Sequence, residues 1–210
     1  MKRFFLSLIA ITILSATAHA ADGWVSLFDG KTLDGWKSNN DTPGCFTVTN
    51  GTLKVSGGRA HLFYVGPTGK AAFANFEFKA KVMTTPGSNS GIYFHTEFQE
   101  KGWPNKGYEC QVNTTHSDAK KTGGLYAIKD VMNVAPSKDN EWFEYDIKVE
   151  GKHVVLQING QTTADFTEPE GWNPPAGMSG RRLSSGTFAL QGHDPKSTTY
   201  YKDIQVKPLP

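Results

Sequence analysis

Short runs of alternating apolar and polar residues, separated by turn residues, constrain the fold of this chain most strongly. The segment 74–82, Ala-Asn-Phe-Glu-Phe-Lys-Ala-Lys-Val, alternates in this way, and so does 145–150. Because successive side chains of a strand point to opposite faces, such alternation is typical of antiparallel sheets with one buried face. After the N-terminal apolar run, no segment has a convincing long helical period. The pattern therefore predicts an all-β sandwich or jelly roll.

Turn residues divide the chain into predicted strands of 4 to 11 residues. Asn50-Gly51 and Asn159-Gly160 have the signature of tight hairpins. The irregular stretches 96–106, 129–140 and 168–185 are long, and long loops on a compact β domain are usually functional rims. The predicted strands are Val25–Phe28, Phe46–Thr49, Thr52–Val55, His61–Tyr64, Ala74–Thr84, Gly91–Glu97, Tyr108–Asn113, Gly124–Ala127, Phe143–Glu150, His153–Ile158, Thr162–Phe166, Gly186–Gln191 and Tyr200–Val206.

The N-terminus has the pattern of a secretory signal. Met1-Lys2-Arg3 precedes an apolar run that ends near the small-residue motif Ala18-His19-Ala20. This pattern predicts cleavage after Ala20, a single mature domain over residues 21–210, and a periplasmic or secreted protein. The alternative is a transmembrane anchor, but the apolar run is short for a full span. No cysteine follows the run, so a lipid anchor is not expected there.

Composition excludes some partners and leaves one covalent question open. The chain has 22 Lys and Arg against 20 Asp and Glu, so charge gives no argument for nucleic acid binding. Its two cysteines, Cys45 and Cys110, could form a disulfide in an exported protein. Cys110 could equally be a small buried residue, because the sequence does not show that the two Cα atoms approach each other.

Two predicted strands combine an apolar face with a polar face that carries reactive groups. In 88–95, Ile92 and Phe94 share one face, and Tyr93 and His95, with Glu97 after them, share the other. In 107–112, Tyr108, Cys110 and Val112 are expected to face the core, and Glu109 and Gln111 the opposite side. A sheet that buries its apolar face would offer histidine, carboxylate and amide groups together. Such groups suit sugar-like ligands and acid–base chemistry.

Each candidate also has a simpler interpretation. Glu109 could be a solvent-facing strand residue, and His95 and His193 could be structural hydrogen-bonding groups. His61, His116 and His153 fall in turn-like or exposed contexts, and Arg181-Arg182 looks like a solvated loop pair. The sequence has no zinc-type cysteine spacing, helical histidine pair, nucleophile elbow or phosphate-binding glycine loop, so no metal site or cofactor is predicted.

A series of motifs resembles one family across nearly the whole mature chain. The motifs are Leu27-Phe28-Asp29-Gly30-Lys31-Thr32-Leu33-Asp34-Gly35-Trp36, Asn75-Phe76-Glu77-Phe78, Asn89-Ser90-Gly91-Ile92-Tyr93-Phe94, Gly107-Tyr108-Glu109-Cys110-Gln111-Val112, Thr122-Gly123-Gly124-Leu125-Tyr126, Asn159-Gly160, Leu190-Gln191-Gly192-His193 and Tyr201-Lys202-Asp203-Ile204. In this order they resemble the 3-keto-disaccharide hydrolase domain, also described as 3-keto-glucoside lyase and 3-keto-glucal hydratase.

The resemblance implies a concanavalin-like jelly roll and chemistry on oxidised glycosides. A ketone at C3 acidifies the C2 proton, a base removes it, and the glycosidic oxygen leaves C1 with help from an acid. Water then adds to the enone, so the net result is hydrolysis. This route does not require the two carboxylates of ordinary glycosidases. Related sandwiches suggest a structural calcium by analogy, although no ligand set stands out in this sequence.

The resemblance also implies roles for individual residues. Glu109 and His193 are expected to transfer protons, and His95 and Tyr126 to polarise the ketone or assist the leaving group. Gln111, Asn89 and Lys129 are expected to orient the hydroxyls of a carbohydrate ligand. The chain departs from the family at His95, where the family usually has arginine.

Two other functions fit the same fold. A non-catalytic carbohydrate-binding module would keep loop aromatic residues without a titratable cluster. An ordinary glucanase would need a second carboxylate near Glu109, for which Glu97 is the candidate.

Overall fold

The computed structural model describes residues 22–210, and they form a strand-rich structure without a helix. The predicted signal segment lies outside the described residues. Within 22–210, no helix has the length and apolarity needed to cross a membrane. The strands are β1 (Val25–Ser26), β2 (Trp36–Ser38), β3 (Phe46–Thr49), β4 (Thr52–Ser56), β5 (Ala60–Tyr64), β6 (Phe76–Thr84), β7 (Asn89–Thr96), β8 (Tyr108–Asn113), β9 (Lys120–Leu125), β10 (Lys129–Met132), β11 (Phe143–Glu150), β12 (His153–Ile158), β13 (Gln161–Thr167), β14 (Thr187–Gly192) and β15 (Thr198–Pro208).

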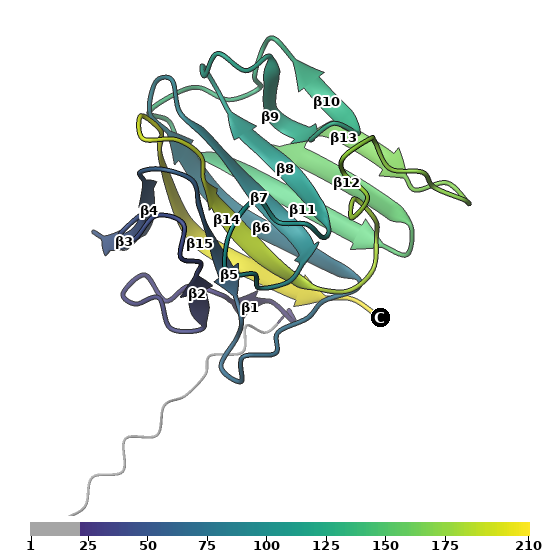
Figure 1. Cartoon of the computed structure of the whole chain (residues 1–210), viewed down its shortest axis with the longest axis horizontal. Helices are drawn as coiled ribbons and strands as arrows, with labels where there is room; N and C mark the ends of the chain where they lie inside the picture. The colour runs from purple at the N-terminus through teal and green to yellow at the C-terminus, as the bar shows by residue number, and fades with distance from the viewer. Residues whose placement is uncertain (1–21) are drawn as a thin grey trace, which may run out of the picture.

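The strands form two antiparallel sheets that lie face to face (Figure 1). The 8-stranded sheet has the order β13-β12-β11-β6-β15-β4-β3, with β1 paired to β15. The 7-stranded sheet has the order β10-β9-β8-β7-β14-β5-β2. Neighbours in each sheet are often far apart in sequence, as β6 and β15 are, so the first and last parts of the domain are joined within one sheet. This arrangement confirms the predicted sandwich of two antiparallel sheets.

The core lies between the sheets and follows the alternation of the sequence. Phe76, Phe78, Ala80 and Val82 of β6 are buried, and the residues between them are at least partly exposed. β7, β8 and β14 differ, because every residue in them is buried. One face of these strands meets the core, and loops cover the other face. The covered outer face of the 7-stranded sheet is therefore the place for a site.

Most predicted strands are confirmed, including β3, β8, β11 and β12 with their exact ends. Asn50-Gly51 and Asn159-Gly160 form the predicted hairpins, with positive φ at all four residues. The predicted strand Gly124–Ala127 is wrong in position, because Ala127 has φ +61° and forms the turn that follows β9. β2 and β10 were not predicted, because both are short and partly polar.

Both cysteines are buried and neither is in a disulfide. Cys110 lies in the core on β8, where burial raises the pKa of its thiol well above the ordinary value. Burial likewise raises the pKa of Cys45 to about 11. Of the two interpretations left open by the sequence, the structure has Cys110 as a small buried side chain.

Candidate active site

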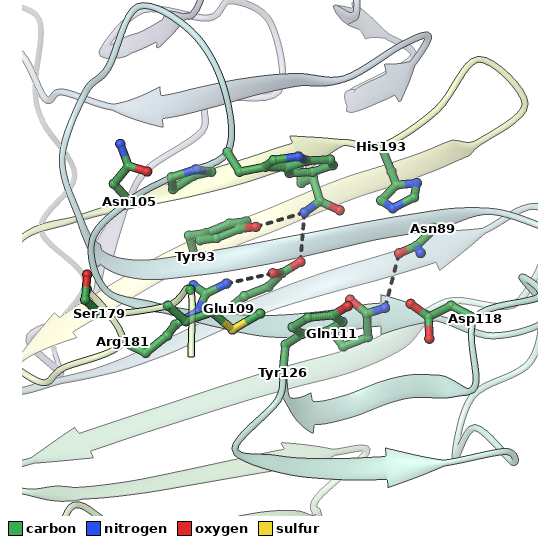
Figure 2. A pocket seen from close by; sticks show the side chains of 16 residues that line it. Asn89, Tyr93, Asn105, Glu109, Gln111, Asp118, Tyr126, Ser179, Arg181 and His193 are labelled. Atoms are coloured by element: carbon green, nitrogen blue, oxygen red, sulfur yellow. Dashed lines mark hydrogen bonds and ion pairs between the residues drawn. The ribbon is translucent and has the colours of Figure 1, made fainter. Parts of the chain in front are cut away.

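A cleft of about 520 Å³ opens on the outer face of the 7-stranded sheet. Its floor comes from β7, β8 and β14, and its walls come from the segments that follow β7, β8, β9, β13 and β14. Figure 2 shows Glu109 near the centre, with Ser179 and Asn105 towards one end and His193 and Asp118 towards the other. The lining residues are Asn89, Tyr93, Trp103, Pro104, Asn105, Glu109, Gln111, Asp118, Tyr126, Gly177, Met178, Ser179, Gly180, Arg181, Gln191 and His193.

Strand alternation places Glu109 and Gln111 in the cleft, as predicted. Their neighbours Tyr108, Cys110 and Val112 point into the core between the sheets. On the adjacent strand β7, Gly91 pairs with Gln111, and a Cβ atom there would lie 2.8 Å from Glu109 Oε1. The glycine therefore leaves the space that the carboxylate of Glu109 occupies.

Glu109 is a buried carboxylate held by two donors. Its Oε2 forms an ion pair with Arg181 Nη2 at 3.1 Å, and its Oε1 accepts a hydrogen bond from Gln191 Nε2 at 2.8 Å. Arg181 Nη1 also donates to the Gly107 carbonyl at 3.2 Å. A carboxylate has about four lone-pair sites, so each oxygen can still accept another proton or hydrogen bond. Glu109 is therefore an ion-paired acceptor at the centre of the cleft.

Arg181 was expected to be solvated, and the structure corrects this. The loop between β13 and β14 is tied down by Glu168, whose Oε2 accepts hydrogen bonds from Tyr108 Oη and the Leu183 amide, each at 2.7 Å. Trp172 Nε1 donates to the Arg181 carbonyl at 2.8 Å. These contacts bring the guanidinium over the sheet, where only 10% of the side chain is exposed. The partner is distant in sequence, so no local signal could have identified it.

His193 lies at the end of the cleft beside a second carboxylate. Its Nδ1 is 2.9 Å from Asp194 Oδ2, which also accepts the Ser197 hydroxyl. Hydrogen bonds from Ser197 and His193 help lower the pKa of Asp194 despite its partial burial. Asp194 Oδ2 is therefore the hydrogen-bond partner that orients the imidazole of His193. The two residues form a histidine–aspartate pair on the cleft wall.

His116 was not expected to contribute, yet it stands beside this pair. Its Nε2 is 3.8 Å from Asp194 Oδ2, and the rings of His116 and His193 are 5.5 Å apart. Donor atoms of His116, His193 and Asp194 all lie within 4.8 Å of one another. Imidazole nitrogens and a carboxylate oxygen are ligands for divalent transition metals, so these residues could hold such an ion. The Asp118 amide, however, donates to His116 Nδ1 at 3.1 Å. Nδ1 is then an acceptor, so the neutral ring carries its proton on Nε2, the nitrogen that faces Asp194.

The other predicted ligand-binding groups in the cleft are Tyr126, Gln111 and Asn89. Burial, followed by the nearby charges of Asp118 and Glu109, raises the pKa of Tyr126, so its hydroxyl stays protonated and can donate. Gln111 Nε2 donates to Asn89 Oδ1 at 3.2 Å. The Oε1 atoms of Gln111 and Gln191 are buried and have no partner among the described residues, so each amide keeps an unused acceptor at the cleft floor.

Two predicted site residues, His95 and Lys129, lie outside the cleft. At His95 the backbone has φ +54°, which interrupts the alternation of β7 and turns the ring inward. Its Nε2 lies 2.8 Å from the Ala74 carbonyl, its Nδ1 accepts the Ser184 amide, and its ring packs on Phe76. Burial lowers the pKa of His95. Lys129 begins the edge strand β10 and is exposed.

Two further expectations from the sequence need correction. Glu97 is exposed, pairs with Lys106 at 3.3 Å and does not line the cleft, so it does not supply the second carboxylate of a glucanase. His61 was expected in an exposed context but is fully buried on β5 beside the cleft floor.

Comparison with known proteins agrees with this architecture. The family described as the 3-keto-alpha-glucoside-1,2-lyase-like domain matches residues 23–207. A 3-keto-disaccharide hydrolase from Bacteroides thetaiotaomicron is 34% identical over 171 residues, which cover 70% of this chain and 59% of that protein. The present chain thus spans less than two thirds of that relative.

Solved structures show the same fold. A putative glycosyl hydrolase from Parabacteroides distasonis superposes with a TM-score of 0.76 at 23% identity, over 90% of this chain and 95% of its own. The carbohydrate-binding module CBM66 from Bacillus subtilis superposes with a TM-score of 0.56 at 14% identity, over 82% of this chain and 95% of its own. These likenesses confirm the predicted concanavalin-like jelly roll. The family match over residues 23–207 establishes that the chain belongs to the 3-keto-alpha-glucoside-1,2-lyase-like family.

Proposed function

We propose that this protein cleaves 3-keto-glycosides by elimination across C2 and C1, followed by hydration. The observation that carries the proposal is that Glu109 and His193 line one cleft, with Glu109 ion-paired to Arg181 and His193 hydrogen-bonded to Asp194. The family match and the curated relative indicate the substrate class.

The two pairs suggest which residue accepts and which donates a proton. Arg181 is the cation beside Glu109, so Glu109 serves as the base that removes the C2 proton. Asp194 holds the imidazole of His193 on the cleft wall, so His193 serves as the acid that gives its proton to the leaving glycosidic oxygen. The carboxylate is a weak base, but the C3 ketone makes the C2 proton acidic enough for it.

Other cleft residues would bind the ketone and the hydroxyl groups. Arg181 uses two of its five N–H donors for Glu109 and Gly107, so others remain for the developing oxyanion. The protonated hydroxyl of Tyr126 can add a second donor. The side-chain amides of Gln111 and Gln191 line the cleft and can hydrogen-bond with sugar hydroxyls. The cleft volume of about 520 Å³ lies in the range of small-ligand sites.

The test compares a 3-keto-glucoside with its unoxidised parent. We expect release of the aglycone from the ketone alone, and solvent deuterium at C2 or a primary isotope effect from C2 deuterium. Glu109→Gln and His193→Ala should each lower kcat by about 10²- to 10⁴-fold. His153→Ala is the matched control, because His153 is exposed on β12 of the other sheet.

Three results would contradict the proposal. Equal turnover of the ketone and its parent would indicate a conventional glycosidase. Binding without turnover of either would indicate a carbohydrate-binding module. Near-normal kcat in folded Glu109→Gln and His193→Ala would remove both residues from proton transfer.

A further inference from the structure

His61 is a fully buried imidazole without a hydrogen bond. It lies on β5 with 0% exposure, and neither Nδ1 nor Nε2 has a partner within residues 22–210. Buried polar groups are nearly always paired, because an unpaired one loses its hydrogen bonds to water without replacement. An apolar side chain of similar size would avoid this cost. The imidazole at this position therefore needs an explanation beyond packing.

The strand register places His61 on the cleft side of its sheet. His61 pairs directly with Gln191 of β14, and residues directly opposite each other share a face. Gln191 reaches into the cleft, where its Nε2 donates to Glu109 and to Tyr93 Oη. The His61 ring meets the Tyr93 ring edge-on, with centroids 5.5 Å apart. His61 is therefore a hidden part of the cleft floor.

The indole of Trp103 covers His61. The two rings are 5.5 Å apart at 74°, and the same indole lies 5.6 Å from the ring of His193. Trp103 lines the cleft and is 42% exposed. The loop backbone beside it is fixed, since the Gly102 amide donates to Asp41 Oδ2 at 2.8 Å. In contrast, the indole N–H donates to no acceptor among the described residues, and the indole is held by its ring contacts and by the Arg59 guanidinium 5.6 Å from its ring, so the side chain can rotate while the loop stays in place.

We propose that His61 is a sugar-binding residue of the cleft, uncovered when the Trp103 indole rotates away. A neutral imidazole offers one donor and one acceptor, which match the hydroxyl groups of a glycoside. Burial lowers the pKa of His61 to about 3, so the ring is neutral under Trp103. The inference rests on the proposed function, because it gives His61 a role toward the same 3-keto-glycoside.

The first experiment separates stability from binding. In His61→Leu, removal of the unpaired nitrogens should raise Tm by about 2 to 4 °C. Loss of a hydrogen bond to the substrate should raise KM for a 3-keto-glucoside by about 3- to 10-fold, with kcat little changed. The matched control is Phe63→Leu, on the same strand, whose ring also packs against His61 but does not line the cleft. We expect it to lower Tm and to keep KM.

The second experiment measures how strongly the Trp103 indole shields His61 from a reagent. Carbethoxylation of His61 by diethyl pyrocarbonate, followed by mass spectrometry, should be at least about 10-fold faster in Trp103→Ala than in the wild type. An unchanged rate would overturn the assignment of Trp103 as the cover. Two results with an active wild type would overturn the role of His61 and leave the proposed function standing. One is an unchanged KM in His61→Leu, and the other is an equal rise in KM in Phe63→Leu. A wild type inactive on the 3-keto-glucoside would overturn both.

Discussion

Replacing Arg181 with methionine would test whether the ion pair with Glu109 organises the cleft. The side chains are only 10% and 8% exposed, and the charged atoms are 3.1 Å apart. At that distance and an effective dielectric constant of about 20, the Coulomb attraction is about 5 kcal/mol. Loss of one partner of a buried pair typically costs about 3 to 5 kcal/mol, because the remaining charge is uncompensated. We expect Arg181→Met to lower the free energy of unfolding by about 4 kcal/mol.

The double variant Glu109→Gln/Arg181→Met separates the charge effect from the loss of side-chain packing. It leaves no unpaired charge, so it should be more stable than Arg181→Met alone, by about 2 kcal/mol. Activity should be lost in both, since the acceptor and the guanidinium are both part of the proposed mechanism. Urea unfolding followed by circular dichroism gives the free energies. The control is Arg182→Met, because Arg182 is exposed and its side chain donates to the Trp172 carbonyl and not to Glu109.

Either of two results would refute this reasoning. A loss below about 1 kcal/mol in Arg181→Met would mean that the pair behaves like an exposed one. Additive losses in the double variant would mean that the two side chains do not interact energetically.

Two further predictions concern stability and export. Burial and the charges of Glu144 and Glu77 raise the pKa of Asp146 from 3.8 to about 6. The contribution of Asp146 to the free energy of unfolding is therefore complete below pH 3.8 and is lost as the pH rises through 6. After allowance for solvent screening, Asp146→Asn should stabilise the fold by about 1 kcal/mol at pH 8 and have little effect at pH 4. Urea unfolding at the two pH values measures this difference. Equal stabilisation at both would show that the raised pKa of Asp146 is not the cause. We also expect export with cleavage after Ala20, so the mature mass should correspond to a chain starting at Ala21; an intact Met1 in the exported protein would contradict this.

Local patterns were enough to predict the fold and the floor of the cleft. Period-two alternation gave the faces of β8 correctly, and the asparagine-glycine pairs gave two hairpins correctly. The alternation failed at His95, where the positive φ turns the ring to the core side. A sequence pattern assumes a regular strand and does not reveal such a break, because histidine is compatible with either face.

The walls of the cleft depend on tertiary contacts, which local patterns do not contain. Arg181 is 72 residues from Glu109 in sequence and reaches it only because Glu168 and Trp172 fix the loop. His61 was assigned to a turn-like or exposed context, yet it is buried under Trp103. In both cases the partner lies in a loop, and loop conformation follows from packing rather than from periodicity.

The cation of the cleft is Arg181, which lies far in sequence from His95, the position where the family usually has an arginine. The family resemblance implied a guanidinium at that point of β7, and the chain instead has a buried imidazole there. Arg181 enters the cleft from the loop before β14 and contacts the carboxylate of β8 directly. The cation beside Glu109 therefore comes from this loop and not from β7. Since the charge acts through its distance to the carboxylate, the element that carries it matters less than the 3.1 Å contact that it makes.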